Sequence, residues 1–515
     1  MKTRLRFSTT AILCAALVLT ATALRADVRL PAIISDHMVL QADMPAPLWG
    51  WADANEKVTV NFAGQTKSTT ADATGKWKIT LDKLAPSADP RPLTVQGNHS
   101  LTVADVLVGE VWLGSGQSNM AMTVSRSLNY DQEQAAARSP QIRMFTVARS
   151  PQPEPQADCT GAWVICAPET VGAFSAAAYF FGRDLHAALK QPVGLINSSY
   201  GGTAIEAWTS TAAQSKLPVY REIDARWAPL LANPYDKAAE DAKFQKRRDA
   251  HKKLVVAAKA DGKTPPRAPR APVDPRFDQN RPGNLFNGMI EPIIPYAFRG
   301  AIWYQGEANS ARTYADQYGI QLATMIREWR SRFGHDFPFA WVQLPDFRKP
   351  QQEPVEAQTW PIIREQMLQA LALPNTGMAI GLGLGEVNDI HPKNKQGIGD
   401  RLAAWALHDV YQRSNESSGP LPASHRIVGN EIVVTFTHAD GLQTKDGELR
   451  GFAIAGADKK FVWAKARIEG NQVIVSSAEV AEPAAVRYAW ADNPVWSLVN
   501  GAGLPASPFR TDDWK

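Results

Sequence analysis

The sequence has few cysteines, and none of them lies in a cluster with the spacing of metal ligands. Of its 515 residues three are cysteines, and only Cys159 and Cys166 follow the N-terminal segment. We therefore expect no metal site and no cofactor. Export to an oxidising compartment would allow a disulfide between these two residues, and the alternative is a pair of buried thiols.

The sequence also lacks a strong charge of one sign and a long apolar run. Its net charge is +4, and removing residues 1–26 would take away four basic residues and no acidic ones, leaving no net charge. This balance argues against binding to nucleic acid. The apolar run Ala11–Thr20 is too short to span a bilayer, follows basic residues and precedes small ones, as in a secretory signal peptide cleaved after Ala26. We expect a secreted or periplasmic protein that does not associate with a membrane.

The length predicts two or three domains. Residues 27–104 contain short alternating strands punctuated by Asn, Gly and Pro, which predicts a small β-sandwich. Residues 105–411 alternate strands and helices, with an interruption at about 213–282. Residues 412–515 return to short strands and glycine turns, and this second β region could pack against the first. The oligomeric state is not indicated.

Strand–helix alternation over 105–411 predicts a parallel sheet covered by helices on both faces. Ligands of such sheets bind at the carboxyl ends of the strands. The strands are expected at about 110–113, 193–197, 300–304, 339–344 and 377–382, and helices at about 175–190, 314–332 and 395–411.

The interruption at 213–282 is basic. Residues 236–261 are rich in Ala and Lys and predict a helix, whereas residues 263–282 are rich in Pro and Arg and predict an extended loop. Between Asp236 and Arg281 there are thirteen Lys and Arg against seven Asp and Glu. This segment is either a patch for an anionic ligand or, as such runs usually are, a solvated face.

In the stretch from Val111 to Met120, an expected apolar strand gives way to small residues, and Ser118 follows just beyond its end. Gly114 and Gly116 permit the backbone angles and the close approach that a tight strand-to-helix turn needs. A serine in this position is accessible to a substrate and to a base. The alternative is a glycine-rich turn with an incidental serine.

Three further polar loops follow expected strands or precede the last helix: Gly201-Gly202-Thr203, Gln305–Asn309 and Asn388–Pro392. A serine hydroxyl needs an adjacent base, usually a histidine, whose tautomer a carboxylate fixes. Backbone N–H groups and a side-chain amide then stabilise the oxyanion. The four loops offer each of these groups, although Asp389 could be a helix cap and Gln305 and Glu307 could merely satisfy loop backbone groups.

These loops resemble the four blocks of the SGNH hydrolase superfamily in its sialate O-acetylesterase-like carbohydrate esterase branch. The matching segments are Gly116-Gln-Ser-Asn-Met120, Gly201-Gly-Thr-Ala-Ile-Glu-Ala-Trp208, Trp303-Tyr-Gln-Gly-Glu-Ala-Asn309 and Asp389-Ile-His-Pro-Lys-Asn-Lys395. The resemblance implies a three-layer α/β/α, flavodoxin-like SGNH hydrolase domain over 105–411, flanked by β-sandwich regions.

The resemblance assigns roles to individual residues. Ser118 would be the nucleophile, His391 the general base and Asp389 the residue that orients His391. The oxyanion hole would combine the Ser118 and Gly202 N–H groups with an amide of the third block, for which Gln305 is our first choice and Asn309 our second. The superfamily usually places its acid three residues before the histidine, where this chain has Asn388.

The two-residue spacing from Asp389 to His391 predicts a specific geometry. In an extended loop, residues i and i+2 point the same way. A carboxylate oxygen would then lie about 2.6–3.2 Å from an imidazole nitrogen.

The function implied by the resemblance is removal of acetyl groups from carbohydrate hydroxyls by an exported serine esterase. The substrate is either an O-acetylated sialic acid, whose carboxylate would pair with Arg312 or Arg281, or a neutral acetylated hemicellulose such as xyloglucan or xylan, for which tryptophans supply stacking surfaces. A non-catalytic carbohydrate-binding protein is the alternative of another class. A secreted serine peptidase is disfavoured, because the motif order matches esterases.

Overall fold

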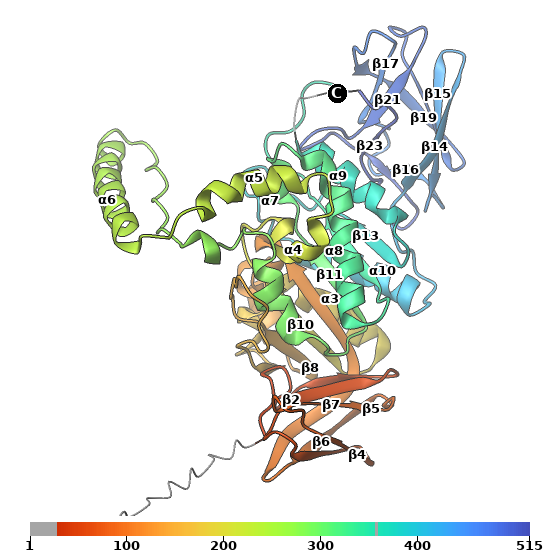
Figure 1. Cartoon of the computed structure of the whole chain (residues 1–515). Coiled ribbons are helices and arrows are strands. Elements are labelled where there is room, and N and C mark those ends of the chain that lie inside the picture. Colours follow the sequence, from red (N-terminus) through yellow and green to blue (C-terminus); the bar gives the residue numbers. More distant parts are fainter. Residues whose placement is uncertain (1–27, 356–358, 515) are drawn as a thin grey trace, which may run out of the picture.

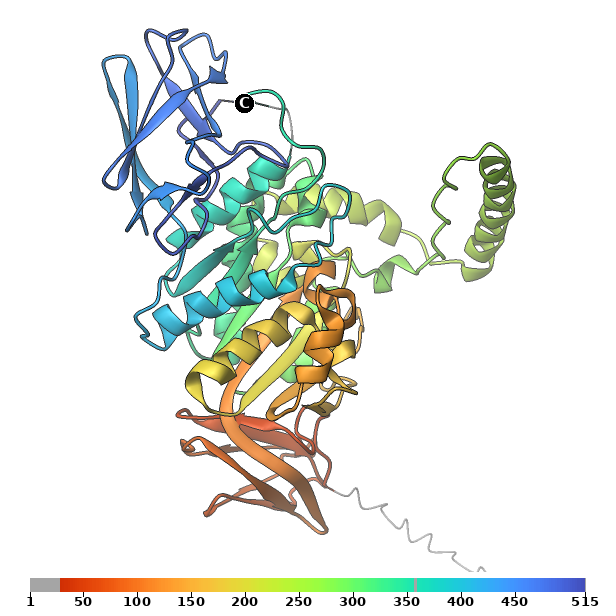
Figure 2. The same ribbon diagram turned by 180° about the vertical axis from the view of Figure 1, so that it is seen from behind.

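The computed structural model describes residues 28–355 and 359–514. The signal peptide predicted over residues 1–26 lies outside these ranges. An α/β body occupies the middle of the molecule, with the N-terminal β region at one end and the C-terminal β region at the other (Figures 1 and 2). The expectation that the two β regions could pack together is therefore wrong. Among the described helices, none is both long and apolar enough to cross a bilayer.

The body is built on one twisted sheet. In spatial order its strands are β13 (Thr376–Ile380), β12 (Phe339–Gln343), β11 (Gly300–Tyr304), β7 (Ser100–Gly116), β10 (Val193–Ser199), β8 (Ser139–Thr146) and β9 (Trp163–Cys166). All neighbours are parallel except the edge strand β9, which runs antiparallel to β8. The parallel sheet predicted from the alternation is confirmed.

Helices cover both faces of this sheet. Side chains alternate across β11: Ile302 and Tyr304 lie in the apolar cluster with α3 (Ala176–Leu189) and α10 (Lys395–Trp405). Ala301 and Trp303 lie in the opposite cluster with α8 (Tyr318–Phe333) and α9 (Trp360–Gln369). Because a strand buried on both faces needs apolar residues at every position, β11 is a continuous apolar run. The three-layer α/β/α architecture is confirmed.

Strand β7 joins the body to the N-terminal β region. Its first half pairs with β6, antiparallel, and with β1, parallel, whereas its second half pairs with β10 and β11 in the body. A single 17-residue strand thus belongs to both parts. The other strands of this region are β1 (Val39–Gln41), β2 (Ala46–Trp51), β3 (Lys57–Phe62), β4 (Gln65–Thr70), β5 (Lys76–Leu81) and β6 (Ser87–Gln96).

The C-terminal region consists of two four-stranded antiparallel sheets and a short pair. The first sheet is β14 (Leu421–Val428), β15 (Glu431–Thr437), β20 (Gln472–Ser476) and β19 (Lys465–Glu469). The second is β18 (Val462–Trp463), β17 (Phe452–Ala455), β21 (Ala485–Tyr488) and β23 (Phe509–Arg510), and the pair is β16 (Gln443–Thr444) with β22 (Leu498–Val499). The fully buried Arg364 of α9 anchors this region, because its guanidinium donates to the carbonyls of Ala491 and Asp492 at 2.7 and 3.0 Å.

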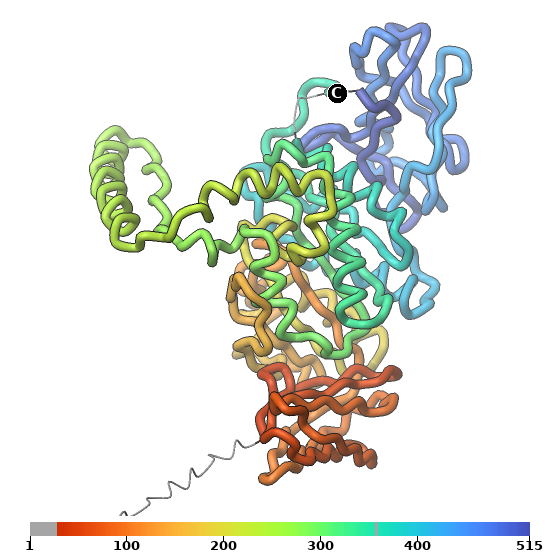
Figure 3. Tube along the Cα trace, in the orientation of Figure 1, coloured from red at the N-terminus to blue at the C-terminus, as the bar shows by residue number. Residues whose placement is uncertain are grey.

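The interruption of the alternation forms a projecting arm. Helix α5 (Tyr220–Leu231) leads away from the body, α6 (Lys237–Ala260) stands clear of it, and the chain returns as an extended loop (Figures 1 and 3). No residue of α6 is buried. Asp236 caps the helix by accepting a hydrogen bond from the Ala239 N–H at 3.0 Å. The remaining short helices are α1 (Ser118–Ala121), α2 (Tyr130–Ala136), α4 (Thr211–Gln214) and α7 (Glu307–Ser310).

Within the described ranges, Cys159 and Cys166 are free thiols. Burial raises the pKa of each thiol to about 12, which keeps both protonated and unreactive at neutral pH. The structure therefore favours the buried-thiol alternative over the disulfide.

Candidate active site

Ser118 lies at the tight turn between β7 and α1. It is the first residue of α1 and is half-buried. Gly116 has a φ of +135°, and a Cβ atom there would lie 2.2 Å from the carbonyl oxygen of Tyr304 on the neighbouring strand. Only glycine fits this position, because both the backbone angle and the close approach exclude a side chain. The Gln117 N–H then donates to the same Tyr304 oxygen at 2.9 Å, which fixes the turn.

The glycine loop after β10 lies directly against the turn that carries Ser118. A Cβ atom at Gly201 would lie 3.2 Å from the Cβ of Ser118, so the missing side chain keeps the serine accessible. Gly202 has a φ of +73°, and its N–H has no acceptor among the described residues. The Ser118 N–H is at the first helical position, where no intrahelical acceptor exists. Two backbone donors of the predicted oxyanion hole are thus available in neighbouring loops.

The two candidate amides of the third loop differ in their hydrogen bonds. Gln305 Nε2 lies 3.0 Å from the Thr203 oxygen, 2.7 Å from Asn309 Oδ1 and 3.2 Å from Gln117 Oε1. Its two protons are therefore engaged, and its side chain joins three loops. Asn309 Nδ2 donates once, to Glu206 Oε2 at 3.1 Å, and keeps one proton. These contacts argue against Gln305, our first choice, and leave Asn309 as the better donor of the two.

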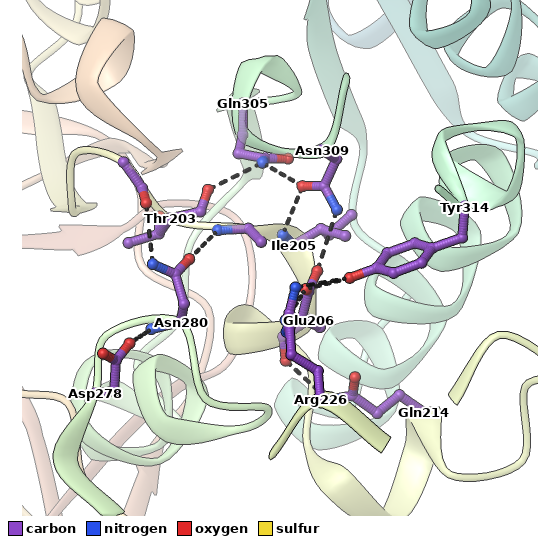
Figure 4. Close-up of polar contacts among 12 residues, drawn as sticks. Thr203, Ile205, Glu206, Gln214, Arg226, Asp278, Asn280, Gln305, Asn309 and Tyr314 are labelled. Carbon is purple, nitrogen blue, oxygen red and sulfur yellow. Dashed lines mark hydrogen bonds and ion pairs between the residues drawn. The ribbon is translucent and has the colours of Figure 1, made fainter. Parts of the chain in front are cut away.

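The arm is tied to the glycine loop at both of its ends (Figure 4). On the outgoing side, Arg226 of α5 pairs with the fully buried carboxylate of Glu206 at 2.9 Å. On the returning side, Asn280 accepts a hydrogen bond from the Ala204 N–H at 2.8 Å and donates to the Gly202 oxygen at 3.2 Å. The insertion therefore supports the conformation of the glycine loop.

The acid–base loop lies between β13 and α10 and contains Asp389 and His391. Its backbone bends at Ile390 and His391 instead of running extended. Asp389 Oδ1 is 3.4 Å from His391 Nδ1 and also accepts the His391 backbone N–H at 2.9 Å. The predicted separation of 2.6–3.2 Å is therefore wrong, because the carboxylate closes a local turn and reaches the ring only at longer range. Asn388, three residues before His391, is exposed.

The surroundings of His391 favour a neutral imidazole. Burial lowers the pKa of His391 below its ordinary value of 6.5; the Asp389 carboxylate opposes this shift, and the positive charges of Lys395 and Arg126 add to it. The side chain keeps 30% of its surface exposed, so substrate and water can reach it. An unprotonated imidazole at neutral pH is the form that a general base needs.

Three of the four loops, those that carry Ser118, Glu307 and His391, meet in a buried polar cluster that the sequence did not predict. Asn119, next to Ser118, donates to the Ile390 oxygen at 2.9 Å and to Glu307 Oε1 at 2.5 Å. Lys395 donates to Asn119 Oδ1 at 2.7 Å. Glu307 and Lys395 stood inside the matched segments, but nothing in their spacing indicates that they are buried.

A cleft of about 1110 Å³ opens mostly between the outgoing and returning segments of the arm and reaches the body at Pro151 and Tyr200. It begins at Tyr200, Gln279 and Asn280, which border the glycine loop, and its wall includes Tyr235 and Phe277. Gln279 also donates to the Gly201 oxygen at 3.0 Å. In the described part of the chain, no group of three or more His, Cys, Asp or Glu side chains has the arrangement of a metal site.

Comparison with known proteins identifies the family. Residues 108–238 and 278–408 match the model of the carbohydrate esterases described as sialic acid-specific acetylesterases. These two segments cover half of the chain and carry all four loops of the site. The chain belongs to this family of carbohydrate esterases. It is therefore a carboxylic ester hydrolase, and the 39 residues between the matched segments are part of the arm.

Relatives in the family match nearly the whole chain. Sialate O-acetylesterases of Rattus norvegicus and Homo sapiens are each 28% identical, over 93% of this chain and 94% and 92% of their own lengths. The crystal structure of a carbohydrate acetylesterase from Xanthomonas citri is 37% identical, with a TM-score of 0.80 over 95% of this chain and 100% of that one.

Proposed function

We propose that this esterase removes O-acetyl groups from carbohydrate hydroxyls, with Ser118 as the nucleophile, His391 as the base and Asp389 as a weak orienting acid. The observation that carries the proposal is the 2.9 Å hydrogen bond from Asn119 to the Ile390 oxygen. Asn119 follows Ser118 and Ile390 precedes His391, so this bond holds the nucleophile turn and the base loop together. Family membership supports ester hydrolysis as the reaction.

The reaction follows from the order of these groups. Ser118 Oγ attacks the acetyl carbonyl carbon while His391 accepts the hydroxyl proton. The tetrahedral intermediate collapses, the sugar oxygen leaves with the proton from His391, and an acetyl-serine remains. A water molecule then gives a proton to His391 and attacks the acetyl carbon, releasing acetate and returning the proton to Ser118.

The negative charge on the intermediate needs donors that are free before the reaction. The N–H groups of Ser118 and Gly202 meet this condition, and Asn309 retains one amide proton. Gln117 is a further candidate that the sequence did not suggest. Its Oε1 accepts the Ala308 N–H at 3.2 Å, whereas its own amide protons have no acceptor among the described residues.

An O-acetylated sialic acid is the substrate that the family supports. Its carboxylate requires a cation near the site. Arg126 is exposed and close enough to His391 to lower its pKa, and it forms no ion pair within the described ranges. Arg281 and Arg312 likewise have no ion-pair partner there, although Arg281 donates to the Arg276 oxygen at 3.1 Å. Arg126 therefore joins the two arginines that the sequence suggested.

The cleft beside the glycine loop favours a second substrate, an acetylated hemicellulose. Its volume is about 1110 Å³, near the upper end of the usual range for ligand pockets, and it reaches the glycine loop at Tyr200. The aromatic side chains of Tyr200, Tyr235 and Phe277 in its wall offer stacking surfaces for neutral sugars.

Acetate release from an O-acetylated sialoside and from acetylated xyloglucan and xylan tests both substrates in one assay. Sialate specificity predicts that Arg126→Ala raises KM for the sialoside and leaves KM for a neutral acetylated sugar unchanged. Hemicellulose specificity predicts that acetate is released faster from acetylated xyloglucan or xylan than from the sialoside. It also predicts that Phe277→Ala affects hydrolysis of these polysaccharides. Absence of acetate release from every substrate, with no labelling of Ser118 by a serine-reactive probe, would instead support a carbohydrate-binding protein.

Residues 1–26 support export to the periplasm or medium. The test is N-terminal sequencing of the protein recovered from each cell fraction. Recovery outside the cytoplasm with Asp27 at the N-terminus is the expected result, and a cytoplasmic protein that retains residues 1–26 would contradict it.

A further inference from the structure

The backbone on both sides of His391 is held by side chains rather than by secondary structure. The carbonyl before the histidine, that of Ile390, accepts a hydrogen bond from Asn119 Nδ2 at 2.9 Å. The carbonyl after it, that of Pro392, accepts one from Lys395 Nζ at 2.7 Å. Because these two carbonyls flank the histidine, the two bonds fix the stretch of chain that carries the imidazole.

The same two side chains are bonded to each other and to the third loop. Lys395 Nζ donates to Asn119 Oδ1 at 2.7 Å, and Asn119 Nδ2 donates to Glu307 Oε1 at 2.5 Å. Lys395 and Asn119 are 0% and 1% exposed, and Glu307 is 7% exposed. A lysine is almost never fully buried unless it is paired. Lys395 is fully buried, and its partners are the oxygens of Asn119 and Pro392.

We propose that Lys395 is a positioning residue that, together with Asn119 and Glu307, holds the base His391 against the nucleophile turn of Ser118. The proposal rests on the roles proposed above for Ser118 and His391. We call Asn119, Glu307 and Lys395 the clamp. None of the three needs to touch the substrate, since each acts through the backbone of the base loop or through the turn.

The clamp explains how the site works with a weak acid–histidine contact. Asp389 reaches the ring only at 3.4 Å and keeps 44% of its side-chain surface exposed, so water competes for it. A histidine in an irregular loop then needs other contacts that fix its position. Displacement of a catalytic group by about 1 Å costs on the order of 10²-fold in rate. The buried bonds of the clamp supply the missing constraint, since a low-dielectric environment strengthens them.

The clamp also sets the charge around His391. Burial lowers the pKa of Lys395 to about 7, against the opposing effect of Glu307. The other charged groups that face Lys395 are Asp389, Glu386 and Arg126. Burial raises the pKa of Glu307. The ammonium of Lys395 in turn lowers the pKa of His391, so its removal has a consequence that a purely structural side chain would not have.

Lys395→Met tests the clamp, because methionine preserves most of the volume and removes the donors and the charge. The matched control is Lys393→Met, two residues away, where the lysine side chain is exposed. We expect kcat of Lys395→Met with an aryl acetate to fall about 10- to 100-fold with KM changed less than about threefold. The acid limb of its kcat/KM profile should move to higher pH, because a charge that disfavours the imidazolium is gone. Lys393→Met should match wild type in both.

A Lys395→Met enzyme within about threefold of wild type in kcat, with the acid limb unmoved, would overturn the proposal. If this variant does not fold by circular dichroism, Asn119→Ala takes its place, because it cuts the Ile390 bond directly. The same loss of kcat at retained KM supports the clamp, and wild-type kcat overturns it. Ser118→Ala in the same assay separates the two proposals: activity there removes the proposed function, whereas an inactive Ser118→Ala with a fully active clamp variant removes only the clamp.

Discussion

The nucleophile turn and the acid–base loop achieve their geometry by different means. Ser118 follows a 17-residue strand paired on both sides, and Gly116 places the turn against the Tyr304 carbonyl. Backbone pairing and close contact with a neighbouring backbone set its position. His391 lies in a bent segment without regular structure, and buried side chains from other loops hold the carbonyls next to it. Strand register fixes the first group, and a polar cluster fixes the second.

This difference indicates where each half of the site is vulnerable. The turn cannot accommodate a side chain at Gly116, because the backbone of Tyr304 lies too close. We expect the loop to tolerate change at the exposed Asn388, to lose some activity at the half-buried Asp389 and to be most sensitive at the buried clamp. Substitutions in the turn and in the loop test this difference, and they follow in order of the size of their expected effect.

Ser118→Ala should have the largest effect. Loss of the nucleophile costs on the order of 10⁶ in kcat in the well-studied serine hydrolase comparison, and the small change should leave the fold and Tm unaltered. Steady-state hydrolysis of an aryl acetate measures the activity, and thermal unfolding checks the fold. A variant that keeps a tenth of the wild-type kcat would exclude Ser118 as the nucleophile.

Gly116→Ala disturbs the backbone contact that positions the turn, without removing any reactive group. The new Cβ would lie 2.2 Å from the Tyr304 oxygen, so the turn has to shift, and a shift of about 1 Å lowers kcat on the order of 10²-fold. Gly64→Ala is the matched control, since Gly64 also has a positive φ of +81° but open space around it. Equal activity and Tm in the two variants would contradict a role for the close approach.

Asp389→Asn should have a smaller effect, about tenfold or less in kcat. The corresponding change in a serine protease costs about 10⁴-fold, but there the acid is buried and bonded to the imidazole. Here the contact is 3.4 Å long and half exposed. Asn388→Ala, at the exposed neighbouring position, should match wild type. A loss of kcat for Asp389→Asn that approaches the protease value would mean that the acid, rather than the clamp, orients His391.

The smallest effect concerns pH. The base must be unprotonated, so kcat/KM rises as pH passes through the pKa of His391, and burial places this limb below pH 6.5. The Asp389 carboxylate raises that pKa, so Asp389→Asn should shift the limb to lower pH, the opposite direction to Lys395→Met. Profiles of kcat/KM between pH 4 and 8 measure both shifts. A wild-type limb above pH 7 would show that a different group titrates.

The strands and helix starts that the sequence predicted are those that a local residue pattern determines. Alternating apolar segments predicted the parallel strands, and Ser175, whose Oγ accepts the Ala178 N–H at 3.2 Å, begins α3 at the expected place. Asp236 likewise begins the arm helix. Strand β8 was not predicted, because Pro140 and Arg143 interrupt its apolar pattern. Only tertiary contact explains it: the buried Arg143 pairs with Asp105 at 2.6 Å.

The sequence suggested candidate reactive groups for the site but not the side chains that support them. Four loops at the carboxyl edge of the sheet suggested Ser118 and His391. The clamp depends on contacts between residues 119, 307 and 395, which no spacing along the chain reveals. Lys395 also opens α10, where a sequence pattern predicts a solvated cation rather than a buried one. The hydrogen-bond partners of Gln305, which occupy its amide, were beyond the sequence for the same reason.

Covalent labelling of the intact enzyme with a fluorophosphonate probe, followed by peptide mass spectrometry, tests directly whether Ser118 is a nucleophile that His391 activates. We expect one modified residue, Ser118, with labelling that depends on His391 and slows in Lys395→Met but not in Lys393→Met. Labelling of another residue, or wild-type labelling of Ser118 in His391→Ala, would contradict it.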